Sequence, residues 1–275
     1  MAARLITGGH TLTVYNRSPA RAAHFGALGA RIAGSPRAAA ERADVIVGMT
    51  ADDESSRATW LGEFGALAAD NLPDALVIEC STLSHDWVLE LSQKVRDRGF
   101  RYVDAPVTGL PDAAAAGTLT LLVGAEPEDM DAARPIFASL ATRVLHFGGV
   151  GQGTVYKLMV NLMGAVQIAS AAEGVALAER AGLDLRLVAD AVASGQAASP
   201  QVVRNVRRFV AGDHGGTVNF TPALRLKDID YALRLAKKLG VSCPFGEVAS
   251  EVYRRLCDSG FASENESRII DVLRR

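Results

Sequence analysis

The chain changes character at Gly151. Before it, short runs with a β-like pattern alternate with alanine-rich helical stretches, and after it, as far as Arg275, the long segments have a helical pattern. Alternation of strand and helix is typical of a largely parallel sheet that is covered by helices on both faces. We therefore predict an α/β N-terminal domain over residues 1–150 and an all-α C-terminal domain over residues 151–275.

Six segments of the N-terminal half have the length and composition of strands. They are Thr11–Tyr15, Val45–Met49, Ala75–Cys80, Arg101–Asp104, Leu119–Gly124 and Arg143–Phe147. The main helical stretches between them are Pro19–Leu28, Pro36–Ala43, His85–Arg98 and Pro127–Ala141. A further helix, from about Gly153 to Ala181, is unusually long and would join the two domains.

Composition narrows the range of functions. The 275 residues carry a formal net charge of −2 with no basic block, so neither nucleic acid nor an anionic membrane is expected as a partner. The cysteines, Cys80, Cys243 and Cys257, form no C-x-x-C pair, which indicates a reducing compartment, and we expect a cytoplasmic protein. No histidine spacing suggests a metal site. The most apolar stretch, Leu158–Ala172, is interrupted by polar residues and is expected to be a buried helix rather than a membrane span.

Two glycines, Gly151 and Gly153, open the long helix, and Lys157 and Asn161 follow four residues apart. Residues at i and i+4 share one helix face, so the ammonium and the amide project together. The positive end of the helix dipole, together with burial, would lower the pKa of Lys157 toward the range that is useful for proton transfer near neutral pH. Taken alone, a lysine on a helix is most often a surface residue, and the remaining motifs decide between the two interpretations.

The chain begins inside the first unit of the N-terminal sheet. Met1–Gly9 has the pattern of a helix and its C-cap, and His10–Tyr15 has that of the strand after it. A nucleotide-binding sheet normally opens with a strand and a G-x-G-x-x-G turn, which holds the pyrophosphate at a helix N-terminus, and no such turn precedes His10. We expect that the natural product starts upstream, and that a chain starting at Met1 binds a dinucleotide weakly.

Asn16-Arg17-Ser18 follows the first predicted strand, where a nucleotide-binding sheet places a residue beside the adenosine ribose. A carboxylate there would accept the 2′-hydroxyl of NAD, whereas a guanidinium with two neutral hydrogen-bonding groups suits a 2′-phosphate. We therefore favour NADP(H) as the cofactor and keep NAD(H) as possible. The same residues are also what a turn and a helix N-cap at Ser18 require.

The motifs, in their order along the chain, resemble those of the β-hydroxyacid dehydrogenases, the family that includes 3-hydroxyisobutyrate dehydrogenase and tartronate semialdehyde reductase. The matching segments are Met49-Thr50-Ala51, Ser81-Thr82, Asp104–Gly109, Gly151-x-Gly153-x-x-x-Lys157-x-x-x-Asn161 and Leu226-Lys227-Asp228. The similarity covers essentially the whole chain. It implies a Rossmann-like first domain, here without its first strand and glycine-rich loop, an all-α second domain joined to it by a long helix, and a homodimer.

The resemblance also implies a mechanism. A hydride passes between the nicotinamide and the carbon that bears the reacting oxygen of a small hydroxyacid or semialdehyde. Lys157 acts as general base in the oxidation and as general acid in the reduction, and Asn161 orients the substrate. Thr108 and Gly109 bind the substrate carboxylate. The residues expected at the cofactor are Asn16, Arg17, Ser18, Met49, Thr50, Ala51, Ser81, Thr82 and Lys227.

Two departures from the family pattern concern the substrate pocket. Thr108 stands where the family usually has serine, and Leu110-Pro111 replaces the second glycine of the segment and its neighbour. The pocket wall is therefore bulkier and stiffer, and the substrate need not be a standard one. Asp104, at the start of the same segment, is expected to accept hydrogen bonds from local backbone donors.

Two other functions stay open. One is an imine-reductase-like enzyme, although that subgroup usually lacks the lysine found here at position 157. The other is a dehydrogenase-like binding or scaffold domain without catalysis, which the missing phosphate loop favours. Retention of Lys157, Asn161, Thr82 and Lys227 together argues against a scaffold. Ser84-His85-Asp86 could suggest acid–base chemistry, but we expect it to cap the helix that follows.

Overall fold

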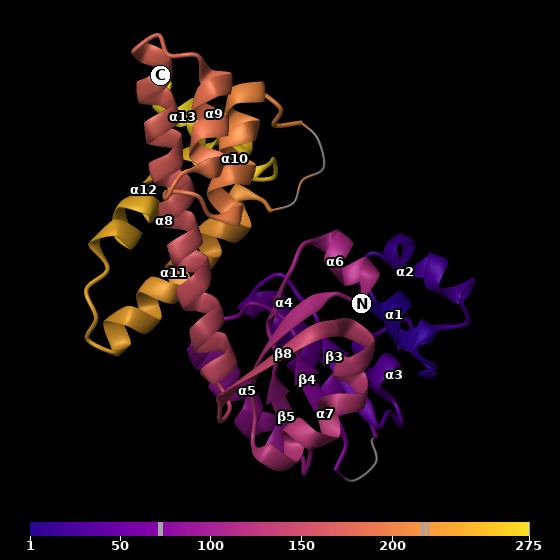
Figure 1. Cartoon of the computed structure of the whole chain (residues 1–275). Coiled ribbons are helices and arrows are strands. Elements are labelled where there is room, and N and C mark those ends of the chain that lie inside the picture. Colours follow the sequence, from indigo (N-terminus) through magenta and orange to yellow (C-terminus); the bar gives the residue numbers. More distant parts are fainter. Residues whose placement is uncertain (71–73, 216–217, 219, 275) are drawn as a thin grey trace. The chain divides into compact units, whose positions relative to one another are not determined.

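The computed structural model describes residues 1–70, 74–215, 218 and 220–274 (Figure 1). The chain forms two compact units, Met1–Lys157 and Leu158–Arg275. The first contains strands and helices, and the described residues of the second contain helices without strands. The expected fold class, an α/β region followed by an all-α region, is confirmed. The functions that we assigned to residues 1–150 and 151–275 stay predictions.

Six strands of the first unit form one sheet. They are β3 (Val45–Gly48), β4 (Leu76–Glu79), β5 (Arg101–Asp104), β6 (Val107–Thr108), β7 (Leu119–Gly124) and β8 (Ala141–Gly148). The order across the sheet is β3-β4-β5-β7-β6, and β8 also pairs with β7. Strands β3, β4 and β5 are parallel, whereas β7 is parallel to β8 and antiparallel to β5 and β6. The sheet is therefore mixed rather than largely parallel, because the connections from β5 through β6 to β7 are too short for the crossover that a parallel pair needs.

A second, smaller sheet lies at the start of the chain. It pairs β1 (Thr13–Val14) with β2 (Arg31–Ile32) in parallel, and in the described residues it shares no strand with the main sheet. The helices of this region are α1 (Ala2–Thr7), α2 (Pro19–Gly26) and α3 (Pro36–Ala40). Helix α1 and its C-cap residue, Gly8, confirm the expectation that the chain opens in a helix.

Helices cover both faces of the main sheet. Those after β3 are α4 (Asp53–Leu61), the 3₁₀ turn Ala66–Ala68, α5 (His85–Asp97) and α7 (Pro127–Leu140), whereas α6 (Pro111–Ala116), between β6 and β7, has no buried residue. Helices α1 and α7 belong to the apolar cluster on one face, and α4 and α5 to the cluster on the other. Successive residues of β4 alternate between the clusters, since Ile78 packs in the first and Val77 in the second. Both are fully buried, which explains why this strand is apolar without interruption up to Glu79.

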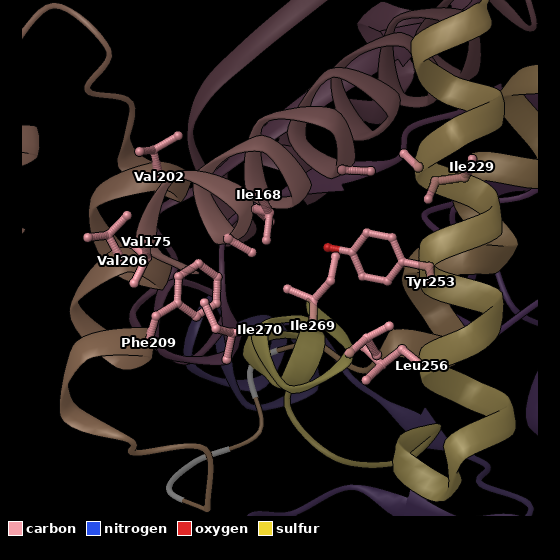
Figure 2. Packing of buried hydrophobic residues seen from close by; sticks show 14 of the residues in the cluster. Ile168, Val175, Val202, Val206, Phe209, Ile229, Tyr253, Leu256, Ile269 and Ile270 are labelled. Carbon is pink, nitrogen blue, oxygen red and sulfur yellow. The ribbon is translucent and has the colours of Figure 1, made fainter. Parts of the chain in front are cut away.

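The second unit is a bundle of helices around one apolar core. Its elements are α8 (Gln152–Arg180, beginning in the first unit), α9 (Leu185–Ser194), α10 (Pro200–Ala211), α11 (Pro222–Lys238), α12 (Pro244–Leu256), a π-helical turn (Cys257–Phe261), a 3₁₀ turn (Glu266–Arg268) and α13 (Ile269–Leu273). Figure 2 shows Ile168 of α8, Phe209 of α10, Tyr253 of α12 and Ile269 of α13 directed toward the same core. The first residue of α10 and of α11 is proline, and Ser199 and Thr221 cap the two helices.

Helix α8 has the length and the apolar composition to cross a membrane, which holds for no other helix in the described part of the chain. Its residues Ala165, Ile168, Ala172 and Val175 follow helical spacing and are buried in the core of the second unit. That packing agrees with the expected buried helix. The helix was expected at Gly153–Ala181 and is found within one residue of that range at each end.

Candidate active site

Two of the segments expected at the cofactor are hydrogen-bonded to each other at the carboxyl ends of adjacent parallel strands. The Thr50 N–H, just after β3, donates to Ser81 Oγ, just after β4, at 2.6 Å. The two hydroxyl groups are also 3.1 Å apart. Ser81 is buried, while Met49 is 57% exposed, so the paired turns offer a surface to a ligand. The carboxyl ends of parallel strands are where α/β sheets bind their ligands, and these residues therefore fit a dinucleotide.

A buried carboxylate connects α4 to the turn that contains Ser81. Glu79, the last residue of β4, is 1% exposed. Its Oε2 accepts hydrogen bonds from Trp60 Nε1 (2.7 Å) and Ser56 Oγ (3.1 Å), both on α4, and its Oε1 accepts the Ser81 N–H at 3.0 Å. Sequence reasoning overlooked Glu79, although an acid that ends an apolar strand two residues before Ser81 was a usable signal.

The start of α5 is tied to the same region. Asp53 accepts hydrogen bonds from both the N–H (2.8 Å) and the hydroxyl (2.6 Å) of Ser84. Ser84 in turn caps α5 by accepting the Trp87 N–H at 3.2 Å. The capping role expected for Ser84-His85-Asp86 is confirmed.

Thr108 and Gly109, expected at the substrate carboxylate, lie at the end of a short strand that the sequence did not predict. Thr108 belongs to β6 and pairs with Thr120 of β7. Both Thr108 and Gly109 are exposed. Gly109 has φ of +134°, and a Cβ there would come within 2.7 Å of Leu119 Cδ2, so glycine is required at this position.

Asp104 binds the beginning of α8. Its Oδ1 accepts the Gly151 N–H at 2.6 Å and its Oδ2 accepts the Thr154 N–H at 2.8 Å. The donors lie 47 and 50 residues further along the chain, so the expectation of local donors was wrong. Burial raises the pKa of Asp104 to about 6, and the two backbone hydrogen bonds oppose that rise.

The glycines of the lysine motif permit this approach. Gly151 has φ of +92°. A Cβ on Gly153 would collide with the carbonyl oxygen of Leu122 and lie 3.0 Å from Asp104 Oδ2. A Cβ on Gly124 would collide with Asp104 Oδ1. The G-x-G spacing is thus a requirement of close packing between α8 and the end of β7.

Lys157 and Asn161 both lie on α8, with Lys157 half-buried and Asn161 buried. In the second unit, Asn161 Nδ2 donates to Asp228 Oδ2 at 2.6 Å, and Asp228 Oδ1 pairs with Lys227 Nζ at 3.1 Å. Asp228 is 1% exposed. The structure therefore joins two predicted site residues, Asn161 and Lys227, through a carboxylate that sequence reasoning had quoted in a motif but given no role.

Asn16, Arg17 and Ser18 form an exposed segment between β1 and α2. The Ser18 N–H donates to Asn16 Oδ1 at 2.9 Å, and Ser18 stands at the N-cap of α2 without a side-chain capping bond. The turn that these residues were expected to form is present, and their role at the cofactor stays a prediction.

Comparison with known proteins agrees with these motifs. Residues 1–149 match the family described as the NAD binding domain of 6-phosphogluconate dehydrogenase, and residues 151–273 match that described as NAD-binding of NADP-dependent 3-hydroxyisobutyrate dehydrogenase. The NAD-dependent L-serine dehydrogenase of Pseudomonas aeruginosa is 32% identical, over 97% of this chain and 91% of its own length.

Solved structures give the same result. The 3-hydroxyisobutyrate dehydrogenase of Mycobacterium tuberculosis, solved with L-serine, has a TM-score of 0.88 at 28% identity and covers 100% of this chain and 94% of its own. Psf3 in complex with NADP+ and 2-OPP has a TM-score of 0.87 at 25% identity and covers 99% of this chain and 95% of its own. The chain therefore belongs to the β-hydroxyacid dehydrogenase family and is an NAD(P)-dependent oxidoreductase of hydroxyacids.

Proposed function

We propose that the protein oxidises a small β-hydroxyacid, or reduces the corresponding semialdehyde, with NADP(H) as the preferred cofactor. The observation that carries this proposal is the fixed amide of Asn161. A carboxylate can only accept hydrogen bonds, so the group that faces Asp228 at 2.6 Å must be the amide NH₂. The carbonyl Oδ1 and the second N–H are then left for a substrate. Lys157, four residues earlier on the same helix, projects from the same face.

Lys157 is the proposed proton-transfer group. In the oxidation, the neutral amine of Lys157 takes the proton of the substrate hydroxyl. A nicotinamide held by the cofactor residues would supply the two-electron chemistry, as the acceptor of a hydride from the carbon that bears this hydroxyl. In the reduction, the Lys157 ammonium returns the proton to the oxygen. Asn161 would hold that oxygen in place, accepting a hydrogen bond from a hydroxyl or donating one to a carbonyl. General acid–base catalysis of this kind contributes ~10²–10⁴ in rate.

The proposed cofactor contacts come from three places. The Met49-Thr50-Ala51 turn and Ser81-Thr82 would lie along the nicotinamide half, held together by the Thr50–Ser81 hydrogen bonds. Arg17, exposed after β1, would bind the adenosine 2′-phosphate and so favour NADP(H). Lys227, held by Asp228, is a further proposed contact with the cofactor.

The proposed substrates carry a carboxylate that one carbon separates from the reacting carbon. Thr108 offers an exposed hydroxyl, and the backbone at Gly109 is open to close approach. Leu110 and Pro111 replace smaller residues of the family pattern and favour a compact substrate. The named relatives act on or bind such molecules, L-serine and 3-hydroxyisobutyrate among them.

The expected homodimer is part of the proposal. The connection between α11 and α12 and the first turns of α12 expose four large apolar residues, Leu239, Val241, Phe245 and Val248. Such a group on one surface is typical of a protein–protein contact. The cytoplasmic location also stays a proposal.

A cofactor and substrate screen tests the proposed activity. Reduction of NADP⁺ and NAD⁺ would be measured with 3-hydroxyisobutyrate, L-serine and glycerate as substrates. Oxidation of NADPH and NADH would be measured with the corresponding semialdehydes. We expect turnover of at least one pair, with a higher kcat/KM for the phosphorylated cofactor. Absence of turnover with all pairs, from a folded protein that binds NADPH, would contradict the proposal.

A further inference from the structure

We propose that Glu79 and Asp104 are positioning residues with separate tasks. Glu79 fixes the two turns that line the proposed cofactor site, and Asp104 fixes the first turn of α8, from which Lys157 projects. The inference rests on the function proposed above and deepens it, because neither carboxylate takes part in the proton or hydride transfer.

Both are the last residue of a strand of the main sheet. Glu79 and Asp104 are 1% and 0% exposed. A carboxylate removed from water is costly unless its oxygens accept hydrogen bonds. Neighbouring positions of the same strands hold the apolar residues Val77 and Val103, which are also fully buried. The two acids are therefore best explained by the groups that they hold.

The hydrogen bonds of Glu79 connect it to the elements that line the proposed cofactor site. Ser56 and Trp60 fix it to α4, which begins directly after the Met49–Ala51 turn, and the Ser81 N–H fixes it to the second turn. Ser81 then accepts the Thr50 N–H. A Cβ on Gly48 would lie 3.1 Å from both carboxylate oxygens, so the end of β3 also packs on this group. One carboxylate thus sets the spacing between the two turns.

The hydrogen bonds of Asp104 connect it to the start of α8, the helix that carries Lys157. Gly151, just before α8, has no side chain that could cap it, and the Asp104 carboxylate supplies the cap from another strand. It accepts the N–H groups of Gly151 and Thr154, which fixes both the position and the rotation of the first turn. Lys157 lies one turn after Thr154, so its direction follows from that anchor.

The test compares two conservative variants. In Glu79→Gln, an amide NH₂ replaces one of two oxygens that face only donors, so one bond to Ser56, Trp60 or Ser81 is lost. We expect the Kd for NADPH, measured by titration calorimetry, to rise about tenfold. At saturating cofactor, kcat should fall by less than about threefold.

In Asp104→Asn, an amide NH₂ replaces one of the two oxygens, so the N–H of either Gly151 or Thr154 faces a donor in place of its acceptor. We expect kcat to fall about tenfold or more, while the NADPH Kd stays within about twofold of wild type. Hydrogen exchange at residues 151–154 should become about tenfold faster in this variant and stay unchanged in Glu79→Gln.

Asp129→Asn is the matched control. Asp129 is a third largely buried carboxylate of the same unit, on α7, and it pairs with Arg101 at 2.7 Å. Its loss should lower thermal stability and leave kcat and the NADPH Kd at their wild-type values. If Glu79→Gln and Asp104→Asn change kcat and Kd in the same proportion, or only as far as their loss of stability accounts for, the separate tasks are refuted.

Two further measurements keep the inference testable. If Asp104→Asn does not fold, Gly151→Ala displaces one donor and leaves the carboxylate in place, and it should give the same loss of kcat. If the wild type turns over no substrate, the proposed function fails, but NADPH binding and hydrogen exchange still decide whether Glu79 and Asp104 hold different elements.

Discussion

Glu79 and Asp104 are register partners on the neighbouring parallel strands β4 and β5, and both carboxylates are buried at the carboxyl ends of those strands. Glu79 binds α4 and the Ser81 N–H, whereas Asp104 binds the N–H groups at the start of α8. The carboxyl ends of two adjacent strands thus carry two anchors, that is, buried carboxylates that fix other elements by hydrogen bonds. Predictions for the site follow from these two anchors and from a third, Asp228, which lies in the helical unit.

Lys157→Ala should lower kcat by ~10²–10⁴, since the variant has no amine to accept or return the substrate proton. The NADPH Kd should change by less than about threefold, because Lys157 acts on the substrate oxygen. Stopped-flow turnover and calorimetric binding measure the two quantities. Turnover close to wild type would rule out Lys157 as the general acid–base.

Asp228→Asn should lower kcat/KM for the substrate by about 10–100-fold. The side-chain oxygen of an asparagine can accept a hydrogen bond from Asn161 or face the Lys227 ammonium. In either case, the NH₂ group of the asparagine faces a donor on the other side. Asp230→Asn is the control, because Asp230 lies two residues further on α11 and binds Ser250 at 2.8 Å instead. Equal effects of the two variants would remove the special role of Asp228.

Arg17→Ala should lower the ratio of kcat/KM for NADPH to that for NADH by about tenfold, since a charge-assisted bond to the 2′-phosphate is lost. Steady-state kinetics with both cofactors give the ratio. Arg21→Ala, on the exposed first turn of α2, is the matched control and should leave the ratio unchanged. A ratio that does not respond to Arg17 would place NADP(H) selectivity elsewhere.

The pKa of Asp104, about 6 in the folded protein against an ordinary 3.8, predicts a specific pH dependence of stability. Between these values the folded state binds more protons than the unfolded state, so the contribution of Asp104 to the free energy of unfolding is greatest below 3.8 and falls as pH rises through 6. From pH 5 to pH 7 it should fall by about 1 kcal/mol. Urea unfolding at both pH values gives the free energy of unfolding of wild type and of Asp104→Asn. The wild-type value minus the Asp104→Asn value should fall by this amount between the lower and the higher pH. A difference that is constant with pH would contradict a raised pKa.

Gly153→Ala should destabilise the protein by about 1–3 kcal/mol, because its Cβ would meet the Leu122 carbonyl oxygen and displace the start of α8. Gly174→Ala lies on the same helix with open space around it and should stabilise the protein by about 0.5–1 kcal/mol. Thermal denaturation compares the two. Similar effects of both changes would mean that close packing does not explain the G-x-G spacing.

Elements with a strong local pattern were predictable from the sequence. Strands β5 and β7 have the expected bounds, and α8 differs from expectation by one residue at each end. Helix α4 was missed because its polar sequence gives a weak apolar periodicity, and its capping box at Asp52 and Ser55 was not used. Strands β2 and β6 were missed because two residues carry no periodicity.

The sequence by itself determined the order of an α/β region and a helical region and the family, and it supplied Lys157 as the candidate for proton transfer. Only the tertiary structure decided that the sheet is mixed, that Asp104 caps α8, and that Glu79 and Asp228 hold Ser81 and Asn161. The physical reason is that a helix or a buried strand follows from side chains a few positions apart, whereas a buried carboxylate takes its donors from wherever the fold brings N–H groups together.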